Sequence, residues 1–334
     1  METDILKHIR TLLKQSSQKI VISSHKNPDG DAIGSGLAMY HVLKELGHEV
    51  FMMVPNHFPK FLAWMYSADE ILIYQDNAKE CQEHIENADI IVSVDYSAFH
   101  RTGAMKQLFI DACATKVLID HHIDPSNEFE LIYSVEGSSS TAELVYNLIV
   151  ELGEDLLTEK VATPLYVGIM TDTGCFSFAC DNPSTFMVAS KLVASGIDAR
   201  TITQKVYNTN TESRTRLLGY SLSERLTVLH EHNTAFIYLT KEDLERHNHQ
   251  VGDTEGLVNY ALGIEGVEFA ALFTERDNLI RISFRSKKDF DVNNFARMHF
   301  DGGGHKNAAG GNSIASLENT LNKFKELLSS SKIL

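Results

Sequence analysis

Histidine and aspartate side chains gather in four short segments that lie far apart in the sequence. A lone segment of this kind has an ordinary explanation, because Asn-Pro-Asp-Gly suits a turn and an aspartate after a strand often caps the next helix. Their joint occurrence, mostly where a predicted strand ends, favours one shared site instead. The segments are His25-Lys-Asn-Pro-Asp29-Gly-Asp31, Asp95, Asp120-His121-His122 and Asp172.

These side chains have the chemistry of ligands for divalent metal ions. Carboxylates combined with imidazoles, without a thiolate, suit Mn²⁺ and, less specifically, Mg²⁺, Co²⁺ or Zn²⁺. The acids are too many for a single tetrahedral zinc ion, and two adjacent cations would relieve the repulsion among them. Two metal ions about 3.5–4 Å apart can activate a water and hold a phosphate during its displacement. The pattern therefore predicts a two-metal site for phosphoryl chemistry.

The elements that would position these residues alternate between strand and helix. Apolar, β-rich runs predict strands at 20–23, 49–54, 89–94 and 116–119. Helical spacing predicts helices at 33–46 and at about 158–170. Ser140-Thr-Ala-Glu143 matches a capping box and predicts a helix that ends near Gly153. This alternation indicates a doubly wound, mostly parallel α/β sheet, in which ligands bind at the carboxyl ends of the strands.

The pattern changes in the second half of the chain. Residues 181–215 look helical and polar, and strand-like runs at 234–239, 267–274 and 279–284 follow at short intervals. Such spacing indicates a smaller α+β domain. We expect a metal-binding domain over 1–190, a helical connector over 191–220 and a substrate-binding domain over 221–334, with a cleft between the domains.

Three consecutive glycines precede a basic pair in this second half, as Gly302, Gly303, Gly304, His305 and Lys306. Such a run costs backbone entropy and needs a reason. One reason is a loop whose N–H groups approach an anion ahead of a helix, and the other is a flexible loop. The basic pair favours the anion. The segment is neither a Walker A loop nor a dinucleotide fingerprint.

A basic cluster lies a little earlier, with Arg281, Arg285, Lys287 and Lys288 within eight positions. On a strand, Arg281, Ser283 and Arg285 would share one face. The cluster is either a solvated edge strand, where lysine is common, or a contact for phosphate groups.

The length and composition of the chain limit the classes of protein to which it can belong. The chain has 334 residues, with 30 Lys and Arg against 45 Asp and Glu, so its net charge is −15. Two domains are expected for this length. The negative charge argues against binding long duplex nucleic acid, whereas a small anion could still bind at metal ions or a local basic site. We see no signal peptide and no membrane-spanning run, and four scattered cysteines fit a reducing cytoplasm.

The order and the residues of the four acidic segments resemble the motifs of the DHH phosphoesterase superfamily. The segment from Gly302 to Gly310 resembles the glycine-rich motif of the associated DHHA1 domain, which family II inorganic pyrophosphatases lack. The length and the lack of extra domains resemble the oligoribonuclease/pAp phosphatase (nanoRNase) branch. RecJ exonucleases are usually larger, and membrane-bound cyclic-dinucleotide phosphodiesterases carry further segments.

The resemblance implies a role for each residue. His122 would face the substrate phosphate, and Asp120 would orient a histidine. Arg285 would contact a substrate phosphate, with Gly303, Gly304, His305 and Lys306 also binding substrate. One metal would be held by His25, Asp29 and Asp95, and the other by Asp31, Asp95, His121 and Asp172, so that Asp95 bridges the two.

The resemblance further implies a cytoplasmic hydrolase with two divalent ions, Mn²⁺ before Mg²⁺ or Co²⁺, that activate a hydroxide for attack on phosphorus. Its substrates would be short oligoribonucleotides, cut to mononucleotides, or pAp, which would lose its 3′-phosphate. A linear or cyclic dinucleotide phosphodiesterase stays open as an alternative. A nucleotide-binding regulator would predict a missing metal ligand, and none is missing. The order of preference among substrates, the direction of degradation and the oligomeric state, including a homodimer, are not decided by the sequence.

Overall fold

The computed structural model describes residues 2–177, 179–277 and 279–330. The chain divides between Thr209 and Asn210 into two units. This division lies within the range 191–220, after one helix of the expected connector and before the next. Among the described helices, none is both long and apolar enough to cross a lipid bilayer.

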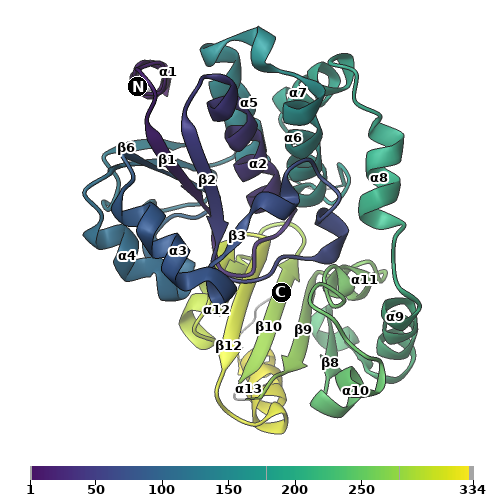
Figure 1. Ribbon diagram of the computed structural model, residues 1–334. Coiled ribbons are helices and arrows are strands. Elements are labelled where there is room, and N and C mark those ends of the chain that lie inside the picture. Colours follow the sequence, from purple (N-terminus) through teal and green to yellow (C-terminus); the bar gives the residue numbers. More distant parts are fainter. Residues whose placement is uncertain (1, 178, 278, 331–334) are drawn as a thin grey trace. The chain divides into compact units, whose positions relative to one another are not determined.

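Six parallel strands form the sheet of the first unit (Figure 1), in the order β3-β2-β1-β4-β5-β6. The chain builds outward from β1 to β3 and then restarts at β4 on the other side of β1. The carboxyl ends of β1 and β4 therefore flank the point where strand order reverses, which is where ligands bind in doubly wound sheets. The strands are β1 (Lys19–Ser23), β2 (Glu49–Val54), β3 (Leu72–Ile73), β4 (Ile90–Val94), β5 (Thr115–Asp120) and β6 (Leu131–Ser134).

The apolar runs explain why the central strands form here. All residues of β4 are buried, as expected for a parallel strand with helices on both faces of its sheet. Side chains alternate between two hydrophobic clusters, so that Ile20 and Ile22 pack on one face and Val21 on the other. The predicted strands are confirmed as β1, β2, β4 and β5. The short strands β3 and β6 were not predicted.

Helices cover both faces of this sheet. Residues of α1, α2, α5 and α6 contribute to one hydrophobic cluster, and residues of α3 and α4 contribute to the other. The predicted helix at 33–46 begins earlier than expected, at Gly30, because the Asp29 carboxylate caps the N–H groups of Asp31 and Ala32 at 3.1 Å each. The helices are α1 (Glu2–Leu13), α2 (Gly30–Glu45), α3 (Tyr74–Glu86), α4 (Lys106–Asp111), α5 (Thr141–Leu152), α6 (Glu159–Asp172), α7 (Pro183–Ala194) and α8 (Ala199–Tyr207).

The second unit has a mixed sheet in the order β11-β12-β10-β9-β8-β7, in which β8 and β9 are parallel and the other neighbours antiparallel. Phenylalanines fill its core, including Phe269, Phe273, Phe284 and Phe324. The three predicted strands are confirmed as β8, β9 and β10. The strands are β7 (Leu226–Leu229), β8 (Thr234–Leu239), β9 (Phe269–Glu275), β10 (Ile280–Ser286), β11 (Gly303–His305) and β12 (Ala308–Ser313), and the helices are α9 (Glu212–Glu224), α10 (Lys241–Arg246), α11 (Leu257–Leu262), α12 (Val292–His299) and α13 (Leu317–Ser330).

Candidate metal centre

All four acidic segments meet at the carboxyl edge of the first sheet. His25 follows β1, Asp95 directly follows β4, and Asp120 is the last residue of β5. Helix α2 begins close to the two aspartates of the first segment, and α6 ends at Asp172. The structure therefore brings together every residue that the sequence placed in a metal site.

A first donor group consists of His25, Asp29 and Asp95, whose ligand atoms lie within 4.8 Å of one another. The Nε2 atom of His25 lies 3.4 Å from Asp95 Oδ2 and 3.9 Å from Asp29 Oδ2. On the other side of the ring, Nδ1 lies 3.0 Å from the carbonyl oxygen of Lys26. A carbonyl can only accept, so Nδ1 carries the proton and Nε2 faces the carboxylates, as in histidines that bind metals.

A second donor group consists of Asp31, Asp95 and His121, again within 4.8 Å. The Nε2 atom of His121 also lies 3.4 Å from Asp172 Oδ2, and its Nδ1 atom lies 3.2 Å from the carbonyl oxygen of Ser138. This ring therefore has the same orientation as that of His25. Burial by itself would lower the pKa of His121, but the charges of Asp172 and Asp31 outweigh it and raise that pKa.

Helices α2 and α6 approach closely enough for Asp172 to reach this group because a glycine lies at their contact. A Cβ atom at Gly168 would lie 2.8 Å from Asp31 Oδ1 and 2.6 Å from the Cβ atom of Ala142. Any larger residue at this position would push α6 away from the carboxylates. Gly168 thus has a steric reason to be glycine.

A third donor group contains Asp95, Asp120 and His122. The Oδ1 atom of Asp120 accepts a hydrogen bond from Nδ1 of His122 at 2.7 Å, which fixes the ring as the prediction for Asp120 requires. Burial would raise the pKa of Asp120, but the hydrogen bond and charge of His122 lower it. The second oxygen, Oδ2, is buried and finds no hydrogen-bond partner within the described part of the chain.

Asp95 is common to all three groups. Its side chain is 3% exposed, and its backbone adopts a left-handed conformation with φ of 66°. Burial, followed by the charges of Asp31 and Asp29, raises the pKa of Asp95 well above its usual value. Such crowding of carboxylates with outward-facing imidazole nitrogens fits divalent cations, whose charge would reverse this effect.

Sequence reasoning missed the residues that orient these carboxylates. The Asp31 carboxylate accepts hydrogen bonds from the N–H groups of Thr141 at 2.6 Å and Ala142 at 2.9 Å. The hydroxyl group of Thr141 also donates to Asp95 Oδ1 at 3.0 Å. The only signal in the sequence was the helix start at Ser140, which indicates a cap but not what the capped helix contacts.

The predicted substrate-binding residues lie in the second unit, on β10, on β11 and in the turn that follows β11. Arg285 of β10 and His305 of β11 are paired with the same residue, Ala308, from opposite sides of β12. Arg285 is half-buried, and its Nη1 atom donates to the carbonyl oxygen of Phe284 at 3.0 Å. Lys306 forms an exposed ion pair with Asp289. The structure thus places Arg285 and His305 on two strands of one sheet with β12 between them, and their role in binding substrate stays a prediction.

The glycine run does not form the expected loop ahead of a helix. Gly303 and Gly304 belong to β11, and the chain turns from them into β12. The N–H group of Gly304 donates to Asn293 Oδ1 at 2.9 Å. A Cβ atom at Gly302 would lie 2.0 Å from the carbonyl oxygen of Gly310. The glycines are therefore explained by the close approach of two strands. The prediction that they precede a helix is wrong, and the binding of an anion by this segment stays a prediction.

Two family models match the chain, the DHH family N-terminal domain at residues 19–169 and the DHHA1 domain at 233–330. A Thermus thermophilus protein, named bifunctional oligoribonuclease and PAP phosphatase NrnA, is 30% identical over 304 residues, covering 90% of this chain and 86% of that protein. The cyclic-di-AMP phosphodiesterase PdeA of Listeria monocytogenes is 31% identical over 322 residues, which cover 90% of this chain and 46% of that protein.

Among solved structures, the chain resembles an exopolyphosphatase-related protein from Bacteroides fragilis. The two share 38% sequence identity with a TM-score of 0.93, over 98% of this chain and 96% of that chain. The two matched regions lie one in each unit and in the order that the motifs predicted. The chain therefore belongs to the DHH family of phosphoesterases, which are hydrolases, and carries a DHHA1 domain in its second unit.

Proposed function

We propose that this protein is a manganese-dependent phosphoesterase that degrades short oligoribonucleotides to mononucleotides and removes the 3′-phosphate of pAp. The observation that carries the proposal is the buried cluster in which Asp95 belongs to every donor group of the first unit described above. The similarity to the Thermus thermophilus protein supports the choice of substrate. We propose the cytoplasm as its location, which its four free cysteines support.

In this proposal, two divalent cations bind at the carboxyl edge of the first sheet. When bound, they supply an activated water and neutralise charge on the phosphate. The chain holds them through the imidazole Nε2 atoms and carboxylates, and buried hydrogen bonds keep these groups in place before substrate arrives. The first ion would contact His25, Asp29 and Asp95, and the second would contact Asp31, Asp95, His121 and Asp172.

His122 acts on the phosphoryl group, and Asp120 acts through His122. Asp120 accepts the Nδ1 proton of His122, so the imidazolium form of the ring presents a second proton, at Nε2, to a phosphoryl oxygen. The charge that develops on this oxygen makes such a donor more effective in the transition state than in the ground state. Asp120 therefore fixes the orientation of His122 and leaves Nε2 as the ring nitrogen that faces the substrate.

We propose that the first unit is the catalytic domain and that the second unit binds the part of the substrate that does not react. A guanidinium group presents two parallel donors to a phosphate, which suits Arg285 for this task. His305 lies on β11 of the same sheet, with β12 between it and the strand of Arg285, and Lys306 follows it. These cationic or protonatable groups are concentrated in a protein whose net charge is −15.

A second candidate function is the hydrolysis of linear or cyclic dinucleotides. The similarity to a cyclic-di-AMP phosphodiesterase over 90% of this chain favours keeping it, although the chain spans only 46% of that protein. The same cluster would serve both reactions, because each breaks a phosphoester bond. The two functions differ only in the substrate that the rest of the protein admits.

A substrate panel with Mn²⁺ distinguishes the candidates. Turnover of pAp, an RNA of two to five nucleotides, a linear dinucleotide and cyclic di-AMP should be measured side by side, with Asp95→Asn as a control for contaminating nucleases. We expect the highest kcat/KM for the short RNA or pAp. Faster turnover of cyclic di-AMP would favour the second function, and no turnover of any substrate would refute both.

A further inference from the structure

Glu143 is a buried carboxylate that the predicted helix cap does not explain. The side chain of Ser140 accepts a hydrogen bond from the N–H group of Glu143, as expected of an N-cap. The carboxylate of Glu143, however, accepts from the hydroxyl group of Ser139 at 2.6 Å rather than closing a capping box. Glu143 is only 4% exposed, although glutamate side chains are seldom so deeply buried in proteins.

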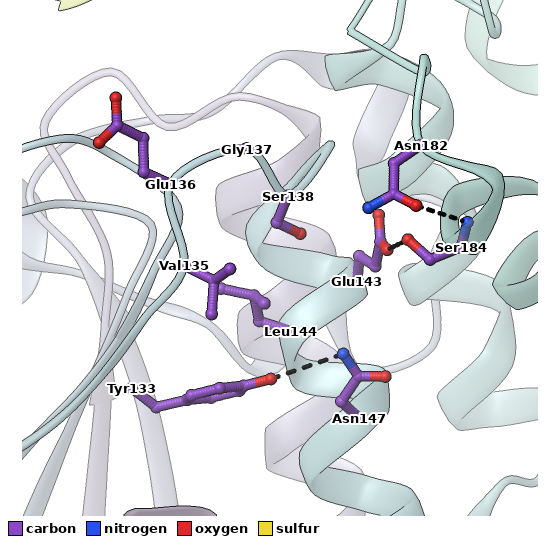
Figure 2. A pocket seen from close by; sticks show the side chains of 10 residues that line it. All are labelled: Tyr133, Val135, Glu136, Gly137, Ser138, Glu143, Leu144, Asn147, Asn182 and Ser184. Carbon is purple, nitrogen blue, oxygen red and sulfur yellow. Dashed lines mark hydrogen bonds between the residues drawn. The ribbon is translucent and has the colours of Figure 1, made fainter. Parts of the chain in front are cut away.

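The same carboxylate also accepts hydrogen bonds from a second helix, α7. The hydroxyl groups of Ser184 and Thr185, at the start of α7, both donate to it, and Thr185 does so at 3.0 Å. Figure 2 shows Glu143 and Ser184 pointing toward each other at the wall of a pocket of about 240 Å³. Three hydroxyl groups from two parts of the chain therefore converge on one buried carboxylate.

Such an arrangement is a costly way to stabilise a fold. Removing a carboxylate from water offsets much of the free energy gained from its hydrogen bonds, and an apolar residue of similar size often stabilises a core as well. Several donors around one carboxylate do, however, fix the geometry of the segments that supply them. Glu143 fixes the short segment that leads into α5, through its contacts with Ser139 and Ser140.

That segment, residues 138–142, carries contacts to three residues of the metal centre. The carbonyl oxygen of Ser138 lies 3.2 Å from Nδ1 of His121. The N–H group of Thr141 donates to Asp31 and its hydroxyl group donates to Asp95. A shift of this short segment would alter all three contacts at once.

We propose that Glu143 is a positioning residue that anchors residues 138–142 to α7 and thereby sets the orientation of the metal-binding side chains. The proposal rests on the proposed function in one respect, that the cluster binds divalent cations. Residues that orient metal ligands typically affect metal affinity about 10- to 100-fold when they are changed. Glu143 itself contacts neither metal nor substrate in this proposal.

The proposal is tested by adding Mn²⁺ to the chelated full-length protein and measuring the binding affinity by titration calorimetry. Glu143→Gln keeps the size of the side chain but turns one acceptor into an amide donor that faces hydroxyl donors. Thr185→Val removes one of these hydroxyl groups without changing the shape of the side chain. We expect the affinity for Mn²⁺ to fall about 10- to 100-fold in Glu143→Gln and by a smaller factor in Thr185→Val. At saturating Mn²⁺, the KM for substrate should stay within about twofold of the wild-type value.

Asn147→Ala is the matched control. Asn147 lies one turn further along α5 and lines the same pocket, but within the described residues its side chain donates just one long hydrogen bond, of 3.5 Å, to Tyr133. This variant should bind Mn²⁺ as tightly as the wild type does. The unfolding temperature of each metal-free variant is measured in parallel.

The outcomes separate this inference from the proposed function. If the wild type binds Mn²⁺ and both variants bind it equally well, the inference is wrong and the proposed function stands. A lower unfolding temperature with unchanged affinity would also overturn it, because Glu143 would then be merely structural. If Glu143→Gln does not fold, Thr185→Val and Ser139→Ala decide by the same criterion. A wild type that binds no Mn²⁺ would overturn the inference and the proposed function together.

Discussion

Charged side chains are buried in the metal centre of the first unit, whereas they are more exposed on the basic face of β10 in the second unit, which carries Arg281 and Arg285. In the first, Asp31, Asp95 and His121 are almost completely buried, and hydrogen bonds from distant parts of the chain hold them. In the second, Arg281 is exposed and Arg285 half-buried, and each extends from one strand. Burial makes neighbouring charges interdependent, whereas exposure leaves them nearly independent. A single substitution should therefore abolish activity when it lies in the metal centre, and should only weaken substrate binding when it lies on the basic face.

Removal of divalent cations tests the first region most severely. After exhaustive chelation we expect no turnover, and we expect Mn²⁺ to restore activity better than Mg²⁺ because two imidazoles belong to the donor set. The measurement is the initial rate of short-RNA hydrolysis against the concentration of each added metal. Full activity after chelation would contradict this prediction, because it would show that turnover does not require bound divalent cations.

Substitutions within the cluster give the next largest effect. Asp95→Ala should abolish turnover more completely than His122→Ala, since Asp95 belongs to every donor group of the first unit described above and His122 to the group that includes Asp120. The loss of one donor to developing charge typically costs about 10²–10³ in kcat, which we expect for His122→Ala.

Rates and metal content of the two purified variants provide the check. The assignment of Asp95 would be refuted by equal residual activity in both variants while Asp95→Ala still binds two metal ions.

A partly buried ion pair in the second unit, between Arg225 and Asp243, tests whether burial alone makes a charged residue sensitive to substitution, since the pair lies outside the proposed metal centre. Arg225 donates to both oxygens of Asp243 at 2.9 Å, and the Asp243 side chain is 5% exposed. Asp243→Asn should lower the free energy of unfolding by about 2–4 kcal/mol, because Arg225 keeps its charge without a partner. Calorimetry of the full chain, with hydrogen exchange of peptides from β7 and β8, would locate the loss.

The effect should depend on pH in a defined direction. Burial would raise the pKa of Asp243, but the hydrogen bond from Arg225 holds that pKa well below its usual range. Its contribution is therefore complete above the unfolded value of about 3.9 and is lost as the pH falls further. The difference between wild type and Asp243→Asn should be constant from about pH 5 to 8 and shrink below about pH 4. Asp277→Asn, at an exposed ion pair with Lys241, is the control and should show no measurable change.

The smallest effects should come from substitutions of the predicted substrate-binding residues in the second unit, Arg285 and His305. Arg285→Ala and His305→Ala should each cost about 1.5–3 kcal/mol in kcat/KM, mainly through KM, if they bind a phosphate that does not react. The loss should be larger for pAp or short RNA than for a simple aryl phosphodiester, which lacks a second phosphate. Metal content should not change.

Arg281→Ala removes the same charge four residues earlier on the same strand and serves as the matched control. Equal losses for all substrates, or a loss of metal from Arg285→Ala, would show that Arg285 is structural. An equal effect of Arg281→Ala would show that net charge, rather than position, governs binding.

Local patterns in the sequence were enough to identify the candidate metal ligands and the sheet that carries them. Residue types and the ends of apolar runs are local properties, so His25, Asp95 and Asp120 could be placed after strands without a structure. The family also follows from these motifs, as the matched regions confirm. Edge strands such as β3 were missed because two residues carry too little periodicity.

Only the tertiary structure decided what the glycines and the helix cap do. The reason for Gly302 is a carbonyl oxygen on the neighbouring strand, and the reason for Gly168 is a carboxylate on another helix. Glu143 matched a local capping pattern, yet its carboxylate is buried against α7, whose start lies about forty residues further along the chain. Close approach and burial depend on which distant elements pack together, and a pattern of neighbours in the sequence does not contain that information.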